Sequence, residues 1–162
     1  IQMKGGICVR ILVISDSHGD SYAIRQAVIQ QPQAKMLFYL GDGLYDLDIL
    51  GSLADKLYIH KVKGNCDFGS IEREFIVDEV EGVRIYCTHG YRENVKMTKS
   101  VLRQRAADNK AHIALYGHTH IPDTTYDDGI WLVNPGSIRE DNYAVIDITD
   151  KGIMPILMKL RY

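Results

Sequence analysis

The sequence predicts an α/β fold in which parallel β-strands are combined with antiparallel hairpins. Three observations support this prediction. Apolar runs alternate with amphipathic segments in the first half, hairpin turns recur in the second half, and no repeat or linker divides the 162 residues. We expect residues 1–162 to form one domain, with Ile1 and Gln2 foreign to the natural chain because they precede a methionine. The pattern leaves open whether the hairpins extend one mixed sheet or form a second sheet packed on the first.

The first half alternates predicted strands with predicted helices. Val9–Ser15 is a β-branched apolar run that ends in polar residues, which is typical of a central strand. Ser21–Gln31 carries apolar residues at helical spacing, so we expect a helix there. The same reasoning predicts strands at 36–40 and 57–62, with a short helix at 45–53 between them. This order favours a largely parallel sheet.

The second half is richer in hairpins. Glu81-Gly82 lies between the apolar segments 75–80 and 83–88 and predicts a tight turn. We expect a basic amphipathic helix over 94–108, followed by a short strand at 113–116. Two more hairpins are expected to turn at 127–129 and at 150–152.

Composition excludes several classes of protein. The net charge of -2 argues against a domain built to hold a nucleic-acid backbone or an anionic membrane. No apolar run approaches the roughly 20 residues of a membrane-spanning helix, and the first residues do not resemble a secretory signal. The three cysteines are too few for a disulfide framework, so we expect a cytoplasmic protein.

Polar clusters follow five of the predicted strands. They are Ser15–His18, Gly41–Asp42, Gly64–Asp67, Thr88–Gly90 and Gly117–His120. Because ligands of open α/β sheets bind at the carboxyl ends of the strands, the clusters are expected to converge on one edge. The glycines that precede three of the polar residues are expected to allow sharp turns there.

The clusters supply ligands for divalent metal ions. The seven candidates are Asp16, His18, Asp42, Asn65, His89, His118 and His120. Asp16 and His18 are two residues apart, as are His118 and His120, so each pair could reach one site from an extended backbone. Seven ligands are too many for one tetrahedral ion, but they suit two ions about 3.5–4 Å apart that share a carboxylate.

The charge of such a centre indicates its substrate. Two divalent ions outweigh the two carboxylates among the ligands, so the site would attract an anion although the protein is acidic. Paired ions also lower the pKa of a bridging water and can hold a phosphoryl oxygen. The residues therefore predict metal-assisted hydrolysis of a phosphate ester.

These motifs, in this order, resemble those of the calcineurin-like metallophosphoesterases. The short chain, Gly64-Asn65-Cys66-Asp67 and the later Asn134–Ser137 are most similar to the small single-domain phosphodiesterases of the YfcE type. The resemblance implies an α/β sandwich of two mixed β-sheets flanked by helices. It also implies one ion held by Asp16, His18, Asp42 and His120, and another held by Asp42, Asn65, His89 and His118, with Asp42 bridging the two.

The resemblance implies a phosphoric ester hydrolase. We expect a phosphodiesterase, with phosphatase activity as a further expectation, that acts on small phosphodiesters by in-line attack of a hydroxide bridging two ions. Manganese is the expected metal, with iron, zinc and nickel as alternatives. Asp42, Asn65 and Asp67 are the expected catalytic residues, and Asp67 is expected to act through hydrogen bonds.

One residue departs from the family pattern. Larger members carry a histidine after the motif asparagine, and this chain has Cys66. A thiol with a pKa of about 8.5 is a poor general acid at neutral pH, so we expect Cys66 at most to position the substrate. Weak catalysis on esters with poor leaving groups should follow.

Two other functions remain open on the same fold. One is a protein-interaction scaffold, and the other is a metal-dependent nucleotide sensor with little turnover. The expected partner is a small phosphodiester or phosphate ester, without a membrane or a strong nucleic-acid footprint. Hairpin edges and the apolar segment 153–160 could also pair between subunits in a homo-oligomer.

Overall fold

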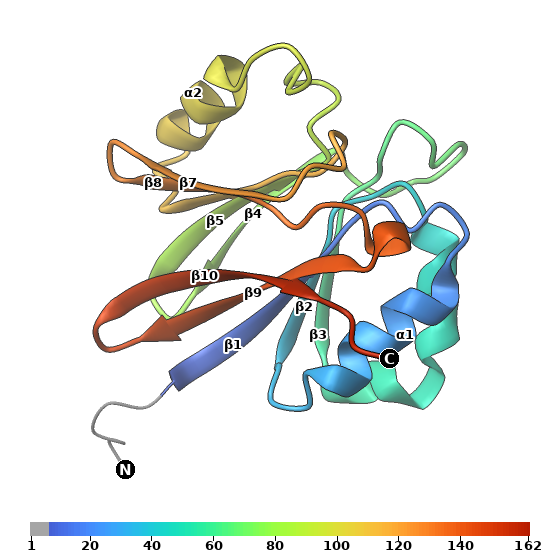
Figure 1. The fold of residues 1–162 in the computed structure, drawn as a ribbon. Helices are drawn as coiled ribbons and strands as arrows, with labels where there is room; N and C mark the ends of the chain where they lie inside the picture. Colours follow the sequence, from blue (N-terminus) through green and yellow to red (C-terminus); the bar gives the residue numbers. More distant parts are fainter. Residues whose placement is uncertain (1–6) are drawn as a thin grey trace.

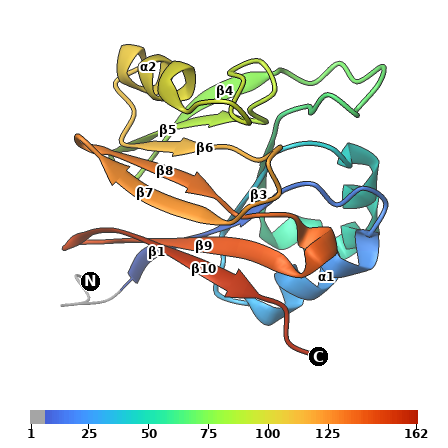
Figure 2. The same ribbon diagram turned by 45° about the horizontal axis from the view of Figure 1, so that its top comes forward.

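Two five-stranded sheets lie face to face in the computed structural model of this chain (Figures 1 and 2). The structure describes residues 7–162, so the expectation for Ile1 and Gln2 lies outside the described residues. The strand order is β10-β9-β1-β2-β3 in the first sheet and β4-β5-β6-β8-β7 in the second. The α/β sandwich of two mixed sheets is therefore confirmed, and the alternative of a single mixed sheet is excluded.

The first sheet is built from both ends of the chain. Its strands are β1 (Ile7–Ile14), β2 (Met36–Tyr39), β3 (Tyr58–Lys61), β9 (Asn142–Thr149) and β10 (Gly152–Lys159). β1 pairs in parallel with β2, and β2 in parallel with β3, as the first half of the sequence predicts. The hairpin of β9 and β10 adds to the other edge of β1 in antiparallel register.

The second sheet contains the strands of the middle of the chain. They are β4 (Phe75–Val80), β5 (Val83–Thr88), β6 (Ile113–Leu115), β7 (Asp123–Asp127) and β8 (Ile130–Asn134). β5, β6 and β8 are parallel to one another, and β4 and β7 close the two edges in antiparallel register. The carboxyl ends of β5 and β6 therefore lie at the same edge of this sheet.

Alternating side chains of β1 divide the core into two parts. Ile11 and Val13 belong to the cluster shared by the two sheets, which also contains Ile85 and Leu115. Leu12 and Ile14 point the other way and pack against α1. Because both faces of the strand are buried over residues 11–14, that part of its sequence is apolar without alternation.

Helices cover the outer faces of both sheets (Figure 1). α1 (Ser21–Gln30) and the 3-10 helix η1 (Leu44–Lys56) pack on the first sheet, and α2 (Ser100–Asp108) packs on the second. A short 3-10 turn, η2 (Ile138–Glu140), precedes β9. No helix in the described part of the chain is long and apolar enough to cross a membrane.

Two helix predictions are wrong in detail. The helix expected over 94–108 begins only at Ser100, because Asn94 has a left-handed φ of 54° and the Thr98 hydroxyl accepts a hydrogen bond from the Ser100 N–H. The segment expected as a short helix at 45–53 is the longer η1. It is interrupted at Gly51, whose φ of 49° and ψ of -125° lie outside the helical region.

Candidate metal centre

The expected ligand residues come together where strands of both sheets end. Asp16 follows β1, Asp42 follows β2 and Asn65 follows β3, all in the first sheet. His89 follows β5, and His118 and His120 follow β6, in the second sheet. The convergence is as predicted, except that two sheets rather than one supply the edge. The site therefore lies where the sandwich is open at one end.

One group of donor atoms comprises Asp16, His18 and His120. The Nε2 atom of His120 lies 3.2 Å from Asp16 Oδ1 and 3.3 Å from His18 Nε2. His18 Nε2 is 3.5 Å from the same carboxylate oxygen. All three donor atoms lie within 4.8 Å of one another, which is close enough for one ion to contact them all. We call this group the first cluster.

A second cluster comprises Asp42, His89 and His118, whose donor atoms also lie within 4.8 Å of one another. His89 Nε2 is 3.2 Å from Asp42 Oδ2. The same oxygen is 3.8 Å from His18 Nε2 of the first cluster. Asp42 thus stands between the two clusters, in the position that a shared carboxylate requires.

His89 provides a test of whether these residues fit a metal ion. Its Nδ1 atom lies 2.7 Å from the Leu40 carbonyl oxygen, which can only accept, so Nδ1 carries the proton. In the neutral imidazole the Nε2 atom presents a lone pair, whereas in metal-free protein a second proton at Nε2 would face Asp42; the atom is buried and forms no hydrogen bond with the described residues. It faces the Asp42 carboxylate. A cation between the two groups would satisfy both, so the donor set fits a divalent metal.

Electrostatics favour the charge states that a metal ligand needs. Burial opposes ionisation of Asp42, but the His89 imidazole and the Cys66 N–H outweigh it and hold the pKa of Asp42 at about 2. Burial, together with the positive charge of His89 and Lys96, lowers the pKa of His118 to about 4. At neutral pH, Asp42 is therefore a carboxylate and His118 a neutral imidazole.

The backbone of the site is strained. Five expected ligands have left-handed φ values: 58° at Asp16, 43° at His18, 61° at Asp42, 70° at His118 and 62° at His120. Each such residue costs about 1–3 kcal/mol and persists only where the surroundings enforce it. The extended backbone assumed for the two-residue spacings is therefore wrong. His118 and His120 in fact serve different clusters.

Two of the glycines are needed because other groups approach them closely. A methyl group at Gly64 would overlap the Asp42 carboxylate, and one at Gly117 would overlap the Ser15 hydroxyl. Neither glycine has a positive φ, so the sharp turn predicted at these positions is not the reason for them. Gly41, with a φ of 98°, does make the predicted turn.

Asp67 holds two ligand loops together. Its Oδ2 accepts hydrogen bonds from the N–H groups of Asp42 and Gly64, both at 2.7 Å. Its Oδ1 accepts from the N–H groups of Gly43 and Leu44, at 2.9 and 3.0 Å. Four backbone N–H groups occupy the two carboxylate oxygens, so Asp67 holds the loop of Asp42 in place through hydrogen bonds.

Asn65 and Cys66 lie at the exposed rim of the site. The Asn65 amide is 3.6 Å from Cys66 Sγ, and Asn65 lines the pocket beside His89. The Cys66 N–H donates to Asp42 Oδ1 at 2.8 Å. Partial burial raises the pKa of the Cys66 thiol, and the negative charge of Asp42 adds to this effect. The thiol is therefore a weaker acid here than in water.

Sequence reasoning missed the groups that support Asp16. The Ser15 hydroxyl donates to Asp16 Oδ2 at 2.5 Å, and the Ser137 hydroxyl donates to the Asp16 carbonyl oxygen at 2.7 Å. Asn134 donates to the Gly117 carbonyl oxygen at 3.2 Å, beside His118. The resemblance to the YfcE-type phosphodiesterases marked residues 134–137 in the sequence, but it did not predict which loops this segment holds.

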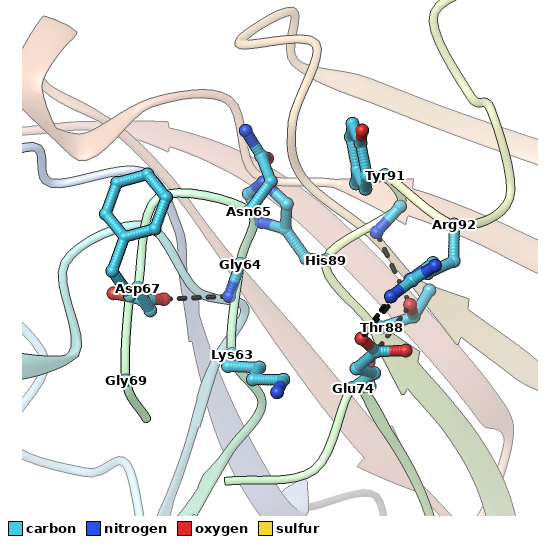
Figure 3. Close-up of a pocket in the computed structure, with 12 residues that line it drawn as sticks. Lys63, Gly64, Asn65, Asp67, Gly69, Glu74, Thr88, His89, Tyr91 and Arg92 are labelled. Atoms are coloured by element: carbon cyan, nitrogen blue, oxygen red, sulfur yellow. Dashed lines mark hydrogen bonds and ion pairs between the residues drawn. The ribbon is translucent and has the colours of Figure 1, made fainter. Parts of the chain in front are cut away.

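A pocket of about 410 Å³ adjoins the second cluster (Figure 3). One wall carries Lys63, Gly64 and Asn65, and the facing wall carries His89 and Tyr91. Figure 3 shows the Arg92 guanidinium paired with the Glu74 carboxylate, at 3.1 Å, at the border of the pocket.

The fold and the two donor clusters define a metallophosphoesterase. Residues 9–151 match the model of the calcineurin-like phosphoesterase superfamily domain, and the chain belongs to this superfamily. The chain is 27% identical over 146 residues to the probable metallophosphoesterase YsnB of Bacillus subtilis, covering 86% of this chain and 85% of that protein.

Solved structures agree with this assignment. A conserved protein of Streptococcus pneumoniae, described as a predicted phosphoesterase, is 30% identical and superposes with a TM-score of 0.79, covering 93% of this chain and 89% of that one. A structure described as a novel archaeal phosphodiesterase is 20% identical, with a TM-score of 0.70, and covers 93% of this chain and all of its own. At that identity, the archaeal protein shows a shared fold alone.

Proposed function

We propose that this protein is a di-metal phosphodiesterase that hydrolyses small phosphodiesters. The observation that carries the proposal is the buried Nε2 of His89, which faces Asp42 with no hydrogen-bond partner among residues 7–162. A group buried in this way costs about 1–3 kcal/mol unless it is satisfied. A resident cation is the simplest reason for keeping it.

The chain's own residues would hold two ions. Asp16, His18 and His120 would bind one, His89, His118 and Asn65 would bind the other, and Asp42 would contact both. Divalent ions, when bound, supply the positive charge that lowers the pKa of a nearby water and holds phosphate oxygens. Manganese is the ion that we propose first, with iron, zinc and nickel as alternatives, because imidazole and carboxylate donors accept all four.

Cys66 limits the range of substrates. Cys66 follows Asn65 at the position where the larger family members carry a histidine, and a neutral thiol is a poorer proton donor than an imidazolium. The leaving group must therefore depart with little protonation from the protein. Diesters with acidic leaving alcohols should be hydrolysed faster than diesters of simple alkyl alcohols.

Hydrolysis by metal-stripped and metal-restored protein tests the proposal. We expect an activated aryl phosphodiester to be turned over after manganese is restored, and faster than the matching monoester. Iron, zinc and nickel, restored singly, would rank the metals. No turnover with two ions bound per chain would overturn the enzyme assignment in favour of a scaffold or a nucleotide sensor.

A further inference from the structure

Two pockets adjoin the candidate metal centre, one on the side of His89 and the other on the side of His18 and Asp42. The pocket of about 410 Å³ adjoins His89 of the second cluster, and a pocket of about 560 Å³ adjoins His18 of the first. They share only Asp67 and Phe68. A phosphomonoester has one organic group to place, whereas a phosphodiester has two. We call the pocket beside His89 the Tyr91 pocket and the pocket beside His18 the Tyr45 pocket, because each of these tyrosines lines one pocket and not the other.

The Tyr91 pocket combines an aromatic ring with an unpaired cation. Tyr91 is 55% exposed, and its ring meets His118 edge-on with the centroids 5.5 Å apart, so the ring is held beside the second cluster. Lys63 lines the facing wall and forms no ion pair within residues 7–162. The Arg92 guanidinium is committed to Glu74. Lys63 is therefore the cation of this pocket that has no ion-pair partner among the described residues.

The Tyr45 pocket has the same two components. Tyr45 is 80% exposed, and Arg139 makes no side-chain hydrogen bond or ion pair with the described residues. The carboxylate of Asp46 in this pocket already accepts from the Ser17 hydroxyl and the Gly19 N–H. The carboxylate of Asp67 is likewise occupied, by four N–H groups. The pocket therefore holds the carboxylates of Asp42, Asp46 and Asp67 against one guanidinium, and Arg139 has no ion-pair partner among the described residues.

Phe68 stands between the two pockets. Its side chain is 83% exposed, although it follows directly on the loop that carries Asn65 and Cys66. An exposed aromatic ring contributes little to the fold, whereas aromatic rings beside a phosphate site offer surfaces on which planar groups stack. Cations next to such rings attract the phosphates and carbonyl oxygens that accompany nucleobases.

We propose that the substrate is a phosphodiester with a planar aromatic ring on both arms, as in a dinucleotide. One arm lies beside Tyr91 and Lys63, and the other lies beside Tyr45 and Arg139, with the phosphate at the clusters between them. The proposal rests on the proposed function for its central phosphate. It adds that each ring contributes separately to substrate binding.

Kinetics with a symmetric and an asymmetric substrate test this arrangement. For a bis-aryl phosphodiester and for a dinucleoside monophosphate, Tyr91→Leu and Tyr45→Leu should each raise KM roughly fivefold to a hundredfold, the range expected for the loss of one stacked ring. A methyl aryl phosphodiester has only one aromatic arm. For this substrate, KM should rise only in the leucine variant whose pocket binds the aryl arm. Tyr91→Phe and Tyr45→Phe keep the ring and should restore KM. Tyr58→Leu removes an exposed tyrosine that lines neither pocket and is the matched control.

Binding separates failure of this proposal from failure of the proposed function. A phosphorothioate-linked dinucleoside resists hydrolysis, and its affinity for the metal-loaded protein can be measured by calorimetry. Weaker binding by both leucine variants at unchanged metal content would support the two pockets even without turnover. Unchanged binding and unchanged KM in both variants would overturn the proposal, whether or not the protein hydrolyses diesters.

Discussion

At the scale of single residues, the clearest sign of function is a group that the protein alone leaves unsatisfied. His89 is 2% exposed, and its Nε2 atom faces Asp42 at 3.2 Å while Nδ1 donates to the backbone. An apolar side chain in place of His89 would avoid the free-energy cost of burying a polar atom without a hydrogen-bond partner, yet the protein has a histidine here. An ion that binds both groups explains why the two residues are placed together.

Asp42→Asn tests the bridging position. The amide keeps the size of the side chain but removes the charge that both clusters share, so we expect activity to be abolished. Metal content, measured by elemental analysis, should fall further than in His120→Asn, which removes a donor from the first cluster only. Equal metal content in the two variants would contradict the shared carboxylate.

Cys66→Ser tests the role of the thiol. Because this thiol is a weak acid and the metal donors remain, the variant should keep its metal and most of its diesterase activity. Cys66→His should raise the rate on diesters with poorer leaving groups, since an imidazolium can protonate them. A collapse of turnover in Cys66→Ser at full metal occupancy would show that the thiol itself takes part in the reaction.

At the scale of structural elements, the site depends on loops that hold one another. The Asp16 N–H donates to the Gly41 carbonyl oxygen and the His18 N–H donates to the Asp42 carbonyl oxygen, which ties the loop after β1 to the loop after β2. Asp67 ties the loop after β2 to the loop after β3. These bonds offset the cost of the left-handed ligand residues and preform the donor clusters.

Asp67→Asn should loosen this assembly. The amide retains one oxygen acceptor, while its NH₂ group would face two backbone N–H donors. We expect a loss of roughly 1–3 kcal/mol in stability, the usual cost of unsatisfied buried donors, together with weaker metal binding. Urea denaturation and metal titration would measure the two effects. Asp55→Asn is the matched control, because Asp55 is exposed and makes no side-chain hydrogen bond or ion pair within the described residues. An equal response of the two variants would rule out a special role for Asp67.

At the scale of the whole molecule, two sheets meet with their strand ends at one site. The first sheet contributes Asp16, His18 and Asp42, and the second contributes His89, His118 and His120. An ion bound between them therefore links the two halves of the sandwich. Metal binding should consequently stabilise the fold as a whole and not only the loops that carry the ligands.

Stabilisation by the metal should depend on pH. Burial disfavours the charged form of His89, but the carboxylates of Asp42 and Asp16 outweigh it and raise the pKa of His89. In metal-free protein, the proton that His89 binds therefore stabilises the folded state. This stabilisation is complete below the unfolded histidine pKa of about 6.5, and it is lost as the pH rises through the higher pKa of His89 in the folded protein. A metal ion takes the place of the proton. The Tm difference between manganese-loaded and chelator-treated protein should thus grow as the pH rises above the unfolded histidine pKa of about 6.5, and a constant difference would contradict this account.

Much of the fold follows from local patterns in the sequence. β-Branched apolar runs predict the strands, and the turn residues 81–82, 127–129 and 150–152 predict the hairpins, because both signals depend on neighbours in the chain. The start of α2 could not be predicted in this way. The segment 94–99 has helical periodicity, but the left-handed Asn94 and the burial of Glu93 against Thr88 keep it out of the helix.

The sequence by itself determined which chemical groups lie at the candidate metal centre. Each ligand residue lies in the loop that follows a strand, and strand ends are local features. Only the tertiary structure decided how those groups are shared. It placed His118 and His120 in different clusters, put Asp42 between them and committed Asp67 to four backbone N–H groups. The physical reason is that these relations join strands of two different sheets, or loops about 25 residues apart, and no local pattern specifies how such segments meet.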